Sequence, residues 1–138
     1  MNIFLDTSAF AKRYIAEKGS GEVAALCQKA DNLCVSIICL PELMSTLSRL
    51  FREKRLSQLD YRRLKRQAVA DLDDVDVCQI TPEVLEALIP LLENHPLRAM
   101  DGLHVGCALV LGPDLFVSAD HRQLLAARKA GLKVANVS

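Results

Sequence analysis

Short apolar runs alternate with longer amphipathic stretches along the whole chain. The runs are Ile3–Leu5, Leu33–Leu40, Val75–Ile80, Leu115–Ser118 and Leu132–Val137. They are short and mostly continuous, which is typical of strands that are buried on both faces of a sheet. The pattern therefore predicts a mostly parallel sheet that is covered by other elements on both sides.

The intervening stretches have the apolar spacing and end signals of helices. Pro41 has the place of a first-turn proline, Ser57 is a cap, and Gly19 and Gly131 end the helices before them. The predicted helices are Ser8–Lys18, Ser20–Ala30, Pro41–Glu53, Leu56–Leu72, Thr81–Asn94, Arg98–Leu111 and Asp120–Ala130. Alternating strands and helices form right-handed β-α-β units, so we expect an α/β fold, a three-layer α/β/α sandwich.

Composition narrows the class of protein. The 138 residues fit one domain, 1–138, and 51% hydrophobic with 25% charged residues is ordinary for a globular protein. The five cysteines contain no C-x-x-C pair, so we expect reduced, buried thiols in a cytoplasmic protein. We expect no signal peptide, because the first residues lack a basic start and a long apolar core, and no membrane span, because no apolar run approaches roughly 18 residues. Its zero net charge argues against coating of nucleic acid by overall charge, but leaves room for a local basic strip.

Carboxylates stand where several of these strands end. Asp6, Glu42 and Asp120 each follow a predicted strand and precede or enter a helix, and Asp101 begins a helix that is apolar on almost every face. Carboxyl ends of parallel strands meet at one edge of a sheet, where ligands bind. We therefore expect these acids to gather at one edge.

Two carboxylates about 4 Å apart repel each other by roughly 4 kcal/mol at an effective dielectric constant near 20. A cluster of such groups needs cations, and oxygen ligands suit Mg²⁺ or Mn²⁺. Taken singly, Asp6 and Asp120 have an alternative explanation as helix caps, and Glu42 as a first-turn acid. Asp101 has no such local explanation, and the four acids together favour a metal site.

Four segments resemble the motifs of PIN-domain ribonucleases, and of VapC-type toxins in particular. They are Leu5–Ser8, Pro41–Leu43, Arg98–His104 and Val117–Asp120. Their order and spacing match across essentially the whole chain, although Gly102 stands where the family usually has alanine. Each motif alone is weak evidence, and the ordered set is specific.

The resemblance implies a PIN-like fold and an endoribonuclease that uses Mg²⁺ or Mn²⁺ to hydrolyse RNA phosphodiester bonds. It also implies the toxin of a type II toxin–antitoxin pair, with a cognate antitoxin and a homodimer as its assemblies. Asp6 and Asp101 are then the main metal ligands, and Asp120 binds directly or through water. Glu42 binds a second ion or orients the attacking water.

Hydroxyl groups near these acids are candidates for supporting roles. Thr7, Ser8 and Ser118 are expected to hold a metal ligand or the scissile phosphate. His104 lies one helical turn after Asp101, so it is either a partner of that carboxylate or a buried structural histidine.

A basic strip contains eight of the 17 lysine and arginine residues within 18 positions. It is either a solvated helical face or an RNA-binding surface. Its members are Arg49, Arg52, Lys54, Arg55, Arg62, Arg63, Lys65 and Arg66.

Two other classes of function compete with the nuclease. A phospho-accepting receiver-like module also collects acids at strand ends, but it needs paired acids after its first strand and a lysine near Ser118. A catalytically silent PIN scaffold that binds RNA or protein does not need all four acids. Nucleotide-binding and serine-hydrolase folds lack their glycine-rich and nucleophile motifs here.

Overall fold

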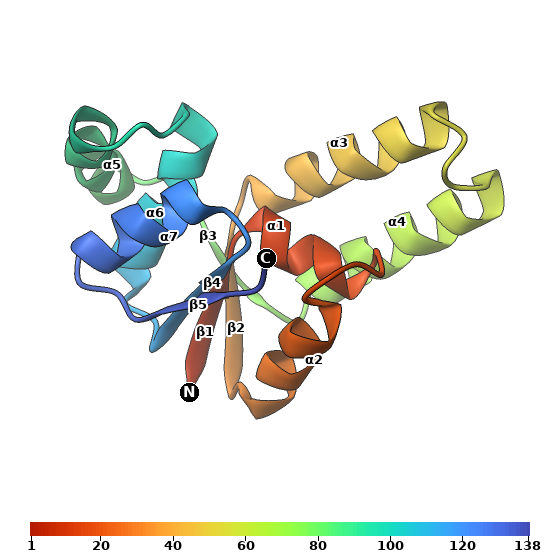
Figure 1. The fold of residues 1–138 in the computed structure, drawn as a ribbon, viewed down its shortest axis with the longest axis horizontal. Helices are drawn as coiled ribbons and strands as arrows, with labels where there is room; N and C mark the ends of the chain where they lie inside the picture. The colour runs from red at the N-terminus through yellow and green to blue at the C-terminus, as the bar shows by residue number, and fades with distance from the viewer.

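A five-stranded parallel sheet forms the centre of the protein (Figure 1). The computed structural model describes residues 1–138, and the strand order is β3-β2-β1-β4-β5. The strands are β1 (Asn2–Leu5), β2 (Asn32–Ser36), β3 (Asp76–Cys78), β4 (Leu115–Ser118) and β5 (Val134–Asn136). Receiver-type folds have the order 2-1-3-4-5 instead. The receiver-like alternative is therefore wrong.

Helices cover both faces of this sheet, with α5, α6 and α7 on one side and α1 to α4 on the other (Figure 1). The helices are α1 (Thr7–Phe10), α2 (Ser20–Lys29), α3 (Cys39–Arg52), α4 (Gln58–Leu72), α5 (Pro82–Asn94), α6 (Ala99–Leu111) and α7 (His121–Lys129), with a 3-10 turn η1 (Ala11–Arg13) after α1. The predicted α/β/α sandwich is confirmed. No helix is both long and apolar enough to cross a membrane.

The central strand β1 contributes side chains to the hydrophobic cores on both faces of the sheet, because successive residues point to opposite faces. Ile3 and Leu5 are fully buried against the α1–α4 side. Phe4 is fully buried on the other side, where its ring stacks on Phe116 with centroids 5.7 Å apart. A strand buried on both faces explains why Ile3–Leu5 is a continuous apolar run.

Two predicted boundaries are wrong. The run Leu33–Leu40 leaves the sheet at Ser36, and α3 already begins at Cys39. Cys39 and Leu43 begin the buried apolar face of this helix. Pro41 fits in the first turn because backbone N–H groups there have no partner within the helix, so the missing N–H of proline costs nothing. Packing thus decides between strand and helix where the apolar run does not.

The helix predicted at Ser8–Lys18 is also shorter, because α1 ends at Phe10 and η1 at Arg13. The chain then folds back, so that the Lys12 ammonium donates to the Lys18 carbonyl at 2.6 Å. All five cysteines are free; four are buried and Cys27 is half-buried.

Two glycines near the start of α2 offer a matched test of this packing. Gly19 has φ of +92°, and a Cβ built there would lie 2.0 Å from the Val137 carbonyl oxygen, whereas a Cβ on Gly21 would meet nothing. We expect Gly19→Ala to lower the free energy of unfolding by at least about 1–2 kcal/mol, since the left-handed conformation disfavours a side chain. Gly21→Ala should raise it by about 0.5–1 kcal/mol. Urea denaturation of both variants measures this difference, and equal effects would contradict the close approach to Val137.

Candidate active site

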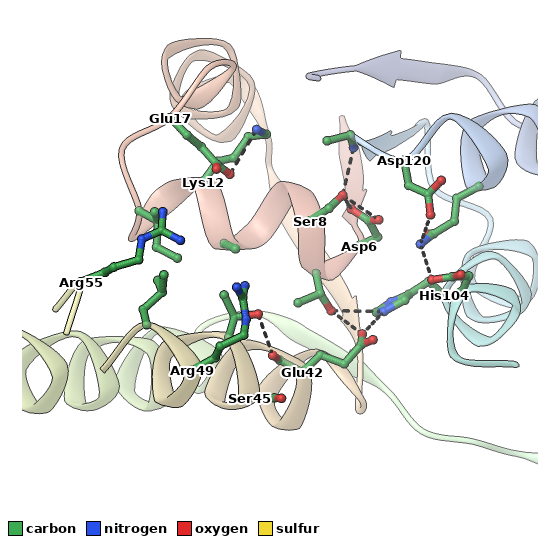
Figure 2. A pocket seen from close by; sticks show the side chains of 18 residues that line it. Asp6, Ser8, Lys12, Glu17, Glu42, Ser45, Arg49, Arg55, His104 and Asp120 are labelled. Atoms are coloured by element: carbon green, nitrogen blue, oxygen red, sulfur yellow. Dashed lines mark hydrogen bonds and ion pairs between the residues drawn. The ribbon is translucent and has the colours of Figure 1, made fainter. Parts of the chain in front are cut away.

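Four carboxylates from four separate elements line one cavity of about 550 Å³. Asp6 follows β1, Glu42 lies in α3, Asp101 lies in the first turn of α6, and Asp120 precedes α7. Parallel pairing of Leu5 with Val117 brings Asp6 and Asp120 to the same edge. Figure 2 shows Asp6, Glu42 and Asp120 facing this space.

Asp6 lies at the base of the cavity and is only 1% exposed. Its carboxylate accepts hydrogen bonds from the Ala9 amide (2.9 Å), from the Ser8 hydroxyl (2.7 Å) and from the Ser118 hydroxyl (2.8 Å). Burial raises the pKa of Asp6 above its ordinary value of 3.8, although His104 and these hydrogen bonds oppose the shift. Asp6 therefore caps helix α1, which was the alternative explanation for this residue, and it is also a desolvated carboxylate that lines the cavity.

The hydroxyls of Ser8 and Ser118 connect the chain segments around Asp6. Each also accepts a backbone hydrogen bond, Ser8 from Ala119 and Ser118 from Asp120. These serines therefore hold the Asp6 and Asp120 loops together, and both contact the Asp6 carboxylate.

Glu42 is held by two side chains on one of its oxygens. Oε1 accepts from the Thr7 hydroxyl at 2.6 Å and lies 2.5 Å from His104 Nε2. Burial alone would raise the pKa of Glu42, but hydrogen bonds from His104 and Thr7 outweigh it and lower that pKa. His104 is buried and contacts Glu42 rather than Asp101, so the buried histidine is the one of its two predicted alternatives that the structure bears out.

Gln123 is a cavity residue that the sequence reasoning missed. Its Nε2 donates to Asp101 Oδ1 at 3.3 Å and to Asp120 Oδ2 at 3.4 Å, and its side chain is buried. The position three residues after Asp120 was the available signal, since a glutamine there reaches the same helix end. Gln123 Oε1 and His104 Nδ1 are the buried side-chain atoms without a hydrogen-bond partner, and both residues line this cavity.

The donor types fit a hard divalent cation, because carboxylate and hydroxyl oxygens dominate the lining. The side chains surround the space without closing on it, and no three His, Cys, Asp or Glu side chains are gathered tightly enough to hold an ion.

The predicted basic strip divides into three groups. Arg49 and Arg55 line the acid cavity, across from Lys12 and Glu17 in Figure 2. Other members line two hollows on α4 that contain none of the four acids: Arg62, Arg63, Lys65 and Arg66. Arg52 and Lys54 line none of these hollows.

Solved structures with this fold include toxins and toxin–antitoxin complexes. A toxin–antitoxin complex from Klebsiella pneumoniae contains a chain 13% identical with a TM-score of 0.71, covering 99% of this chain and 98% of that one. VapC20 of Mycobacterium tuberculosis, described as a sarcin-ricin loop cleaving toxin, is 19% identical with a TM-score of 0.69 over 94% and 95% of the two chains. FitAcB of Neisseria gonorrhoeae is 18% identical with a TM-score of 0.71 over 97% and 96%. A search of curated protein sequences gave no match.

The family model described as "PIN domain" matches residues 3–129. This range contains Asp6, Glu42, Asp101 and Asp120, and all strands except β5 and the first residue of β1. The chain belongs to the PIN domain family.

Proposed function

We propose that this protein is an endoribonuclease dependent on Mg²⁺ or Mn²⁺, and the toxin of a type II toxin–antitoxin pair. The observation that carries the proposal is the cavity lined by Asp6, Glu42, Asp101 and Asp120 in a chain of the PIN domain family. Similar folds in a sarcin-ricin loop cleaving toxin and in toxin–antitoxin complexes support RNA as substrate and an antitoxin as partner.

In this mechanism Asp6 and Asp101 would be the main ligands of the cation, and Asp120 would bind it directly or through water. Glu42 would hold a second ion or orient the attacking water. When bound, the cation lowers the pKa of water and stabilises charge on the departing oxygen. Thr7 and His104 fix Oε1 of Glu42, which leaves Oε2 without a protein donor. Asp6 differs, because Ser8, Ala9 and Ser118 together donate to both of its oxygens. Both acids are thus oriented before substrate arrives.

A homodimer belongs to the same proposal. Leu85, Ile89 and Leu92 lie three or four residues apart on α5 and remain 47%, 58% and 36% exposed. Such a stripe places apolar side chains on one helical face, as at a subunit interface.

Cleavage of a circular RNA tests the nuclease directly, because a circle offers no end to an exonuclease. We expect the wild type to linearise it only with Mg²⁺ or Mn²⁺. Asp101→Asn should lower the rate by at least about 100-fold, since losing a ligand removes several kcal/mol of charge stabilisation. The exposed Asp74→Asn is the matched control. A wild type that leaves the circle intact with either metal would indicate a silent scaffold.

Asp6→Asn should abolish cleavage and change how stability depends on pH. The pKa of Asp6 is raised in the metal-free folded state above its ordinary value of 3.8. Between these two pKa values the folded protein binds more protons than the unfolded chain. The free energy of unfolding therefore falls as the pH rises from 3.8 toward the pKa of Asp6. Asp6→Asn removes this decline. Urea unfolding in EDTA at several pH values measures it.

Asp74→Asn serves as control for the pH experiment, since this acid is exposed and should leave the decline in place. An Asp6→Asn variant with the same decline as wild type would show that the buried carboxylate is not its source.

Gln123→Leu tests whether this residue positions the metal ligands, because the substitution should affect Mn²⁺ affinity and folding stability differently. Loss of the amide that contacts Asp101 and Asp120 should weaken Mn²⁺ binding by about 10- to 100-fold. The free energy of unfolding should be unchanged or higher, because a buried oxygen without a partner disappears. Calorimetric titration with Mn²⁺ and urea unfolding measure the two effects. Gln28→Leu, at an exposed position of α2, is the control, and unchanged Mn²⁺ affinity in Gln123→Leu would contradict the positioning role.

A further inference from the structure

Basic side chains approach the acid cavity from two sides. A second hollow of about 560 Å³ adjoins the cavity and shares Glu42, Asp101 and Asp120 with it. This hollow is also lined by Arg98 and Arg122, while Arg49 and Arg55 line the first cavity. The three shared acids therefore lie between two arginine pairs.

Arg98 and Arg122 are placed where helix stability disfavours them. Arg98 is the N-cap residue of α6, and Arg122 lies in the first turn of α7. A cation at a helix N-terminus opposes the helix dipole by about 0.3–1 kcal/mol. Both side chains are exposed, and neither forms an ion pair with a carboxylate. Their guanidinium groups are thus free to bind an anion.

On the Arg49 and Arg55 side of the acids, no close ion pair neutralises the two guanidinium groups. Both approach the single carboxylate of Glu53, at 3.8 Å and 3.9 Å, which is beyond hydrogen-bond distance. Lys12 differs, because its ammonium is buried and contacts Glu17 and the Lys18 carbonyl. The available cations of this cavity are therefore the two arginines.

Neither hollow is lined by Phe, Tyr or Trp. Proteins that bind single strands by base stacking rely mainly on such side chains, whereas arginine binds backbone phosphates through paired hydrogen bonds. The chemistry of the surface therefore suits phosphates rather than bases.

We infer that RNA crosses the four acids as a single strand, with phosphates held on both sides of the cleaved bond. Arg49 and Arg55 bind the strand on one side, and Arg98 and Arg122 bind it on the other. This inference rests on the proposed nuclease function. The arginines on the outer face of α4, Arg62 and Arg66, line separate hollows and lie outside this path.

The salt dependence of RNA binding tests the path. Fluorescence anisotropy with a labelled single-stranded RNA in Mg²⁺ gives Kd at several salt concentrations, with Asp101→Asn present in every protein to prevent cleavage. Each phosphate contact on a single strand contributes about 0.7 to the slope of log Kd against log salt. Replacing both arginines of either pair by glutamine should therefore lower that slope by about 1.4.

The control replaces Arg62 and Arg66 by glutamine, which should leave the slope unchanged. A slope that falls for only one of the two pairs, or equally for the control, would overturn the two-sided path. Failure of the proposed function looks different: the protein without Asp101→Asn then leaves RNA uncut with either metal, whereas the salt slopes of the Asp101→Asn proteins test the path separately. Thermal melting of each variant checks that these exposed substitutions leave the fold intact.

Discussion

The buried carboxylate of Asp6 is the constraint on which the rest of the molecule depends. A desolvated carboxylate is costly unless several donors surround it. The Ala9 amide and the Ser8 and Ser118 hydroxyls are those donors, and they come from both sides of the β1–β4 pair. The same contacts fix the start of α1 and the loop after β4. The hydrogen bonds that offset the desolvation of Asp6 therefore also fix the chain segments at the sheet edge where the other acids lie.

Much of this arrangement could be predicted from the sequence, because the relevant signals are local. Apolar runs end at Asp6 and near Asp120, and parallel pairing of β1 with β4 brings those ends together. The buried character of α6 likewise follows from its apolar composition. The joint lining of one cavity by four acids agrees with that prediction, whereas their roles as ligands stay proposals.

Other features depend on packing that no local pattern contains. The apolar residues Ile37 to Leu40 suit a strand or a helix equally, and burial of Cys39 beneath the sheet decides for the helix. His104 is one turn from Asp101 in sequence, yet it contacts Glu42 because α3 approaches α6 across the cavity. The contact of Gln123 with Asp120 is local, but its contact with Asp101 depends on how α7 packs against α6. Tertiary distances between helices determine all three.

The contact between Asp6 and Ser118 joins residues 112 positions apart. Chains are synthesised from the N-terminus, so Asp6 leaves the ribosome long before the strand that supplies Ser118. Helices α1 to α4 and the β1–β2 pair can form early, but β4 must arrive before the central pairing and the acid cavity exist. A nascent chain without β4 therefore carries Asp6, Glu42 and Asp101 but neither Asp120 nor the assembled site. The cavity can therefore assemble only after β4 has been synthesised.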